Sequence, residues 1–159
     1  MHQHSRQGAQ ARIGFRAASL ADATMLLAWR NAPVVRASSG DPHTITAKTH
    51  QTWMRAVLAD PQRRLVVATL DGIDAGCVRF DCDSPQATVS IYLAPSALGK
   101  GLGAAIIDAA CGALFEDRPD IHTIRAQVLP GNAASAKAFV RAGFSPTQQI
   151  LCRQRSAPT

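Results

Sequence analysis

The chain has 159 residues, 47% hydrophobic and 18% charged, which suits one globular domain and excludes a second full one. No stretch approaches the roughly 20 apolar residues that span a bilayer, and residues 1–11 lack the apolar segment of a secretion signal, so we expect a cytoplasmic protein with no membrane contact. Most of the net charge of +6 comes from the end segments, which contain Arg6, Arg12, Arg153 and Arg155 and no acidic residue. The body between them is nearly neutral, which argues against a nucleic-acid-binding face.

Residues 1–11 are polar and aperiodic, which predicts a disordered lead ahead of the folded domain. Residues 13–17 are expected to form a short strand. A helix should follow, because Ser19 with Asp22 three residues later resembles a capping box, and Asn31-Ala32-Pro33 should end it.

A second helix is expected to begin after Thr46, whose hydroxyl is a good N-cap. Its apolar positions Trp53 and Val57 recur at helical spacing, and Asp60-Pro61 should stop it.

The hydrophobic period then changes to that of strands. Residues 65–70 and 73–80 are rich in Val, Ile and Phe, and Asp71-Gly72 between them favours a two-residue hairpin turn. A polar turn at 81–85 leads to a third strand at 87–93, so we predict an antiparallel meander.

The last third of the chain alternates helices with strands. A long amphipathic helix is marked by apolar positions from Leu102 to Leu114, and a strand is expected at 122–128. A helix at 133–141 should end with Gly143 as its C-cap, followed by a last strand at 144–152.

This order predicts one α/β domain over residues 12–152, with a mixed, mostly antiparallel central sheet and helices on both faces. Residues 153–159 are expected to form a flexible tail. Four cysteines, Cys77, Cys82, Cys111 and Cys152, fall in expected ordered segments and are interpreted as buried free thiols. A structural zinc site requires two closely spaced pairs of Cys or His, and the sequence has no second pair besides Cys77 and Cys82, so we predict no structural metal.

The strongest local signal is a glycine-rich loop between a strand and a helix, formed by Leu98, Gly99, Lys100, Gly101, Leu102, Gly103 and Ala104. Residues without Cβ let backbone N–H groups approach an anion, and a helix N-terminus adds unpaired donors and a partial positive charge. The segment therefore predicts a pyrophosphate site.

Three other interpretations of this loop fit less well. A Walker loop requires Ser or Thr after Gly-Lys, and Gly101 follows Lys100. A dinucleotide fingerprint requires an early parallel unit and a later third glycine. A plain turn remains the unspecialised alternative.

A second motif runs from Val128 to Phe144 and contains Pro130-Gly131-Asn132, a short helix and Gly143-Phe144. Together, the glycine loop and this motif, about 30 residues apart, resemble the GNAT superfamily of N-acetyltransferases, and the resemblance covers residues 12–152. It implies acetyl-coenzyme A (acetyl-CoA) as cofactor and a primary amine as acceptor.

The resemblance also implies contacts for coenzyme A between two strands that splay apart. It assigns Tyr92, Leu93 and Ala94 to the pantetheine arm and Gly99 to Ala104 to the pyrophosphate, with Leu98 opening the cofactor-binding loop. It assigns Asn132 and Ser135 to the thiol end, and Ala138 and Phe139 to packing along the arm. Asn132 also reads as an ordinary N-cap of the last helix.

Several positions depart from the family pattern. Leu98 stands where Arg or Gln is usual, which removes a side chain but no backbone donor. Phe139 replaces the Tyr that protonates the leaving thiolate in many members, and Ala87 and Thr88 occupy the region of a common Glu base.

Activity can survive these losses, because a thiolate is a tolerable leaving group and positioning supplies much of the rate. We expect the Leu93 N–H to stabilise the oxyanion. For proton transfer the sequence offers His50, Tyr92, Asp81 and Asp83, without a basis for ranking them.

The N-terminal third is similar to a narrower group, the nucleotide-linked aminosugar N-acetyltransferases of the pseudaminic-acid type. The residues that carry this similarity, and that it implies for the substrate, are Trp29, Arg30, Asn31, Arg36, His50 and Trp53. An indole could stack on a base or sugar, and the arginines could meet a diphosphate, although both tryptophans also suit core positions.

Other classes remain open at this point. Protein N-termini and other small amines are alternative acceptors, and a non-catalytic acyl-CoA-binding module is conceivable because the usual acid and base are missing. A basic nucleic-acid-binding domain is the third class. The resemblance favours a homodimer.

Overall fold

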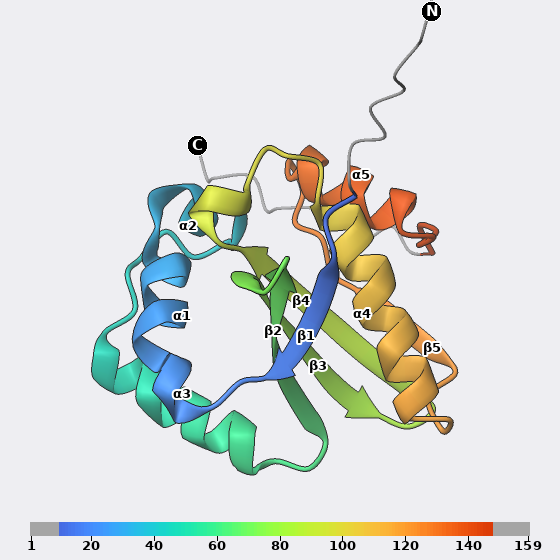
Figure 1. Cartoon of the computed structure of the whole chain (residues 1–159), viewed down its shortest axis with the longest axis horizontal. Coiled ribbons are helices and arrows are strands. Elements are labelled where there is room, and N and C mark those ends of the chain that lie inside the picture. Colours follow the sequence, from blue (N-terminus) through green and yellow to red (C-terminus); the bar gives the residue numbers. More distant parts are fainter. Residues whose placement is uncertain (1–9, 148–159) are drawn as a thin grey trace, which may run out of the picture.

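The computed structural model describes residues 10–147 and contains one sheet there, with strand order β1-β2-β3-β4-β5 (Figure 1). The strands are β1 (Ile13–Ala17), β2 (Arg63–Leu70), β3 (Ile73–Asp83), β4 (Gln86–Leu93) and β5 (Thr123–Ala126). The first four pair antiparallel, and only β5 runs parallel to its neighbour β4. The predicted mixed, mostly antiparallel sheet is confirmed.

The hairpin between β2 and β3 turns at the expected residues. Asp71 and Gly72 have φ angles of 51° and 81°. Two consecutive positive φ values identify the tight turn whose twist matches that of the flanking strands.

Helices cover both faces of the sheet, as predicted. One face carries α1 (Ala23–Asn31) and α3 (Ala47–Ala59), and the other carries α4 (Gly103–Asp117) and α5 (Ala133–Arg141). Strand alternation divides the core between them: Val78 packs in the cluster under α4, whereas its neighbour Cys77 packs under α1 and α3.

Three expected boundaries need correction. The chain does end α1 at Asn31, but a further helix, α2 (Pro33–Ser38), begins at once, because proline fits the first turn of a helix as well as it ends one. The turn expected at 81–85 is narrower, because ladder pairing continues to the pair Asp83 and Gln86.

The strand expected at 122–128 is also shorter than predicted, since β5 leaves the ladder after Ala126. Residues 144–147 are not in a strand, and the rest of the expected strand at 144–152 lies outside the described residues. The same holds for residues 1–9 of the predicted lead, for Cys152 and for the predicted tail.

Helix α5 ends as the sequence predicts, at Gly143. This residue has φ 96°, and its N–H donates to the Val140 carbonyl, while the Phe144 N–H donates to the Phe139 carbonyl, each at 3.0 Å. The rings of Phe139 and Phe144 meet edge-on with centroids 5.1 Å apart. This pair of hydrogen bonds with its apolar contact is the Schellman ending of a helix.

Three cysteines, Cys77, Cys82 and Cys111, are buried with free thiols. Burial raises the pKa of the Cys77 thiol to about 11 and that of Cys111 also to about 11. Both thiols are therefore protonated at neutral pH. Within residues 10–147 no helix has the length and apolar character to cross a membrane.

Candidate functional site

The centre of the site is a gap between β4 and β5. Their parallel ladder runs from the pair Gln86 and Thr123 to the pair Val89 and Ala126, and there it stops. Strand β4 continues to Leu93, so its last four residues have no described partner strand on that side. The two strands therefore splay, as the family resemblance implied.

Backbone groups of β4 point into this gap. Ala94 donates its N–H to the Ala75 carbonyl across the β3 side at 2.8 Å. Because consecutive residues of an antiparallel strand alternate their hydrogen-bonding side, the N–H and C=O groups of Leu93 and Ile91 face the gap. Leu93 was expected there as an oxyanion donor. Ile91 was missed, since only the register with β3 shows which amides are free.

The glycine loop connects this gap to helix α4. After a 3-10 turn, η2 (Pro95–Ala97), Gly99 and Gly101 adopt φ angles of 71° and 69°, which side chains with a Cβ rarely tolerate. Helix α4 then begins at Gly103, so its unpaired N–H groups stand at the end of the loop. The loop thus has the geometry of an anion site, with the Lys100 side chain exposed beside it.

The start of α5 closes the other wall. Asn132 caps this helix, accepting a hydrogen bond from the Ser135 N–H at 3.1 Å, so its capping role is confirmed. Ala138 faces α4, where a Cβ on Gly103 would lie 3.7 Å from the Ala138 methyl carbon. Phe139 is only 6% exposed and belongs to the core.

The face of the sheet beneath α1 and α3 is open at one point. Ser90 is exposed although it lies in the middle of an interior strand, and its cross-strand partner is Arg79. The Arg79 guanidinium lies 5.7 Å from the ring centroid of Trp53 on α3. Sequence reasoning missed this exposed position over Ser90 and Arg79 on the α1 and α3 face of the sheet.

Six residues were expected to contact the substrate. In the structure some of them are engaged in contacts within the chain, and others keep polar groups that could bind a ligand. Asn31 clamps residue Ile45, donating to its carbonyl and accepting from its N–H at 2.8 Å each. Arg36 donates to the carbonyls of Asn31 and Pro42. These side chains hold the segment after α2 against α1, using both polar atoms of the Asn31 amide and the Nε and Nη1 of Arg36.

Trp29 and Trp53 both serve as packing anchors. Trp29 packs against the core under α1 and also against the small cluster of Ala75, Ala94 and Ala97 at the start of the glycine loop. Trp53 stacks on His50 with centroids 5.7 Å apart.

Arg30 and His50 each keep a buried polar atom, Nη1 and Nε2 respectively, without a hydrogen-bond partner among the described residues, and of the two Arg30 carries the charge. It lies close enough to Tyr92 and Asp41 to favour the charged form of each. A buried guanidinium donor without a partner is costly unless a ligand supplies an acceptor.

The candidate proton carriers are all constrained. The Tyr92 hydroxyl donates to the Leu26 carbonyl at 3.5 Å, and burial raises its pKa far above the usual range, so it stays a phenol. His50 is 4% exposed with its Nε2 unpartnered, and burial lowers its pKa. Asp81 lies 3.2 Å from Arg79 and 3.4 Å from Arg63, whereas Asp83 is exposed.

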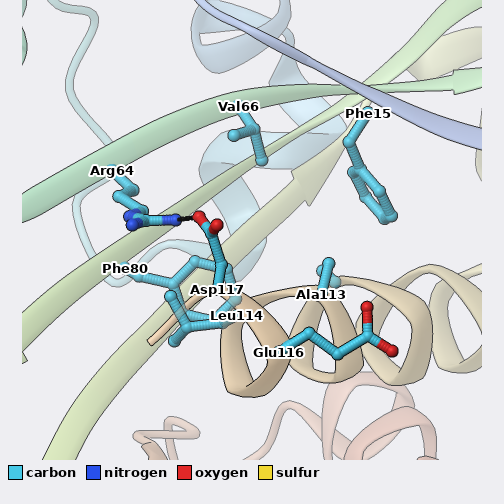
Figure 2. A pocket seen from close by; sticks show the side chains of 9 residues that line it. Phe15, Arg64, Val66, Phe80, Ala113, Leu114, Glu116 and Asp117 are labelled. Atoms are coloured by element: carbon cyan, nitrogen blue, oxygen red, sulfur yellow. Dashed lines mark hydrogen bonds and ion pairs between the residues drawn. The ribbon is translucent and has the colours of Figure 1, made fainter. Parts of the chain in front are cut away.

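A separate groove lies at the other end of α4 and encloses about 390 Å³ (Figure 2). Phe15, Val66 and Phe80 line it from the sheet, and an ion pair between Arg64 and Asp117 crosses it. Glu116 and Asp117 place negative charge there, at the negative end of the helix dipole. This groove is therefore unsuited to a pyrophosphate. Among residues 10–147 no group of three or more potential ligands could hold a metal ion.

Comparison with known families decides the assignment. The model of the acetyltransferase (GNAT) domain matches residues 12–145. The chain belongs to the GNAT acetyltransferase family. This GNAT domain is an acetyl-CoA-dependent N-acetyltransferase, which confirms the enzyme class and the cofactor expected from the sequence. No curated protein sequence matches the chain.

Solved structures share the GNAT fold at low identity. Aminoglycoside acetyltransferase AAC(6')-Ib in complex with coenzyme A has a TM-score of 0.77 and 23% identity, over 87% of each chain. Spermidine N-acetyltransferase from Vibrio cholerae with CoA and spermine has a TM-score of 0.77 and 18% identity, over 87% of this chain and 83% of the other. At these identities the likeness establishes the fold and leaves the acceptor open.

Proposed function

We propose that this GNAT domain acetylates the amino group of a small molecule that also carries an anionic group, specifically a nucleotide-linked aminosugar. The observation that carries the catalytic half is the gap between β4 and β5, with unpaired backbone groups of Ile91 and Leu93, leading to the glycine loop. Acetyl-CoA supplies the activated acetyl group as a thioester.

The residues around the gap fit this cofactor. Backbone N–H and C=O groups of Ile91 and Leu93 can form hydrogen bonds with the amide groups of an extended pantetheine arm, as they would with a neighbouring strand. The positive φ angles of Gly99 and Gly101, and the N-terminus of α4, suit the pyrophosphate. Leu93 remains our candidate oxyanion donor, and we propose that Asn132 and Ser135 lie near the thiol end.

The acceptor side of the cleft favours anions. Arg30 has a buried donor without a partner, and Arg79 stands beside the exposed Ser90. The neighbouring structures hold aminoglycosides and spermine, according to their names, and these polycations would meet repulsion at two guanidinium groups. A diphosphate would instead satisfy the Arg30 donor.

Proton handling follows from the same geometry. Asp81, the candidate base among the described residues beside Arg79, is paired with that guanidinium and is therefore not a free carboxylate. The acceptor amine must therefore arrive deprotonated or lose its proton to water, and we expect positioning to dominate the rate. The Tyr92 phenol is protonated and is a candidate donor of a hydrogen bond to a leaving thiolate, although in this structure it donates to the Leu26 carbonyl.

Thiol release from acetyl-CoA against a panel of amines tests the proposal. The panel contains UDP-linked aminosugars, aminoglycosides, spermidine and peptide N-termini. We expect release with the nucleotide-linked sugars, and preference for spermidine or an aminoglycoside would refute the anionic acceptor.

The same assay with Arg30→Met should raise the acceptor KM about tenfold or more, as expected for loss of a charge-assisted contact, with unchanged affinity for coenzyme A. Arg55→Met is the matched control, because Arg55 is exposed on α3. Equal KM values in both variants would remove Arg30 from the site.

A further inference from the structure

The sheet has an uncovered polar stretch on the face that carries α1 and α3. Strand alternation puts Val89 of β4 in the core under α4, so its neighbours Thr88 and Ser90 point to the opposite face. Ser90 is exposed there, although β4 is an interior strand between β3 and β5. The helices of this face therefore leave the middle of β4 open to solvent.

Three strands contribute side chains to this surface. The register pairs Arg79 of β3 with Ser90 of β4, and Arg125 of β5 with Thr88 of β4. Paired residues point to the same face of a sheet, so these four side chains share one surface, which we call the open face. The spacing of strands and residues puts the Cα atoms of Arg79 and Arg125 about 12 Å apart, which two long side chains can span around one ligand.

The two arginines of the open face are available to a ligand. The Arg79 guanidinium lies 5.7 Å from the centroid of the Trp53 ring, and its Nε lies 3.2 Å from a carboxylate oxygen of Asp81. That Nε atom is buried and makes no hydrogen bond among the described residues. Arg125 is exposed and forms no ion pair within residues 10–147. Arg79 is thus held in place by its neighbours, and Arg125 is free to move toward a ligand.

The acidic residues of this face do not cancel the charge of the two arginines. Asp81 also lies 3.4 Å from the Arg63 guanidinium, so its single charge is shared between two cations. Asp83 is exposed two residues further along β3, away from the gap. Positive charge is therefore in excess at the end nearer the gap, which favours an anion there.

The open face borders the gap between β4 and β5. The ladder between these strands stops one residue before Ser90, so Ser90 is the first residue of β4 beyond it. Arg79 and Arg30 both lie close enough to the Tyr92 hydroxyl to favour its charged form. The open face therefore adjoins Arg30 as well as the gap.

We propose that the open face is a phosphate subsite for the acceptor, in which Arg79 and Arg125 hold a phosphate or diphosphate group over Ser90. The inference rests on the proposed function, which puts the acetyl group in the adjacent gap. Guanidinium groups bind phosphate oxygens through paired charge-assisted hydrogen bonds, and the hydroxyls of Thr88 and Ser90 can donate further bonds. Arg125 is thereby a specificity-determining residue that extends the anion contact of Arg30 across β4 to β5.

Pyrophosphate is the probe for direct binding. Calorimetric titration uses the full chain with saturating coenzyme A, so that the glycine loop is already occupied. The unchanged chain should bind pyrophosphate, and Arg125→Met should weaken this binding at least about fivefold. Arg141→Met is the matched control, since it removes the same charge from an exposed position of α5 on the opposite face, and its affinity should equal that of the unchanged chain.

A charge placed within the open face gives the second test. Ser90→Asp puts a carboxylate beside Arg79 at an exposed position, and should reduce the pyrophosphate affinity at least about tenfold relative to Ser90→Asn. Asn has the size of Asp without its charge, so thermal unfolding should give the same Tm for both variants. Equal pyrophosphate affinities of the two variants would overturn the subsite.

Kinetics with two acceptors separates phosphate binding from a general loss of structure. With a UDP-linked aminosugar, Arg125→Met should raise the acceptor KM at least about fivefold and leave kcat within about twofold, because Arg125 binds a part of the acceptor away from the reacting amine. With the same aminosugar lacking the nucleotide, the KM should not change. An equal rise with both acceptors would show that Arg125 acts on the structure and not on the phosphate.

The outcomes separate the inference from the proposed function. Failure of the unchanged chain to bind coenzyme A would overturn the proposed function and this inference together. Normal binding of coenzyme A, with no binding of pyrophosphate or with equal pyrophosphate affinities of Arg125→Met and Arg141→Met, would overturn the phosphate subsite alone.

Discussion

The charge at the start of helix α4 gives the sharpest test of the coenzyme site. Replacing Gly103 with Glu places a carboxylate at the first helical residue, beside the proposed pyrophosphate. The position is half-buried, and a Cβ there meets only the Ala138 methyl at an ordinary 3.7 Å, so the backbone need not move. The substitution therefore tests charge more than packing.

The expected effects on folding and binding have opposite signs. Two unit negative charges about 5 Å apart repel by about 3 kcal/mol at an effective dielectric constant of about 20. Solvent screening leaves about half of that repulsion, so the dissociation constant for coenzyme A should rise at least about tenfold. Stability should instead increase by about 1 kcal/mol, because Glu is a better helix former than Gly and suits the N-terminus.

Calorimetric titration with coenzyme A and thermal unfolding measure the two effects. Gly112→Glu is the matched control: Gly112 is an exposed glycine of the same helix with no neighbour within 4 Å of its Cβ position. The control should gain stability and keep its affinity. Equal affinities of the two variants would refute an anion site at the start of α4.

Three further predictions concern the surroundings of the site. Burial lowers the pKa of His50, so the unfolded chain takes up a proton on this residue at a higher pH than the folded chain does. The contribution of His50 to the free energy of unfolding should be complete above pH 6.5 and should fall as the pH drops below it. Urea unfolding at pH 7.5 and 5.5 should therefore show a smaller fall for His50→Leu than for the unchanged chain. Asn31→Ala leaves two backbone groups of Ile45 unpaired and should lower the free energy of unfolding by about 2 kcal/mol in urea titration. A loss under about 0.5 kcal/mol would show that water replaces the two hydrogen bonds of the Asn31 side chain. Phe139→Tyr puts a hydroxyl into a position that is 6% exposed, so it should lower the free energy of unfolding by about 1–3 kcal/mol in thermal unfolding. Turnover should not rise. Faster thiol release would show that the phenol reaches the sulfur.

Local chemistry explains which elements the sequence could predict. The Asp71-Gly72 turn, the Thr46 cap and the Gly143 ending each depend on residues within a few positions, and all three were found. Helix α2 was missed because Pro33 is equally compatible with ending one helix and starting the next.

The candidate site divides in the same way. The sequence by itself determined the family, the position of the glycine loop before helix α4 and the capping role of Asn132, because these depend on short motifs whose residues act close to one another. Only the tertiary structure decided that Ile91 and Leu93 face the gap and that Asn31 and Arg36 bond to backbone groups. It also decided that two of the six expected substrate residues, Arg30 and His50, each keep a buried atom without a partner in the described part of the chain. The physical reason is that strand register and helix packing set these distances, and both depend on contacts between residues dozens of positions apart.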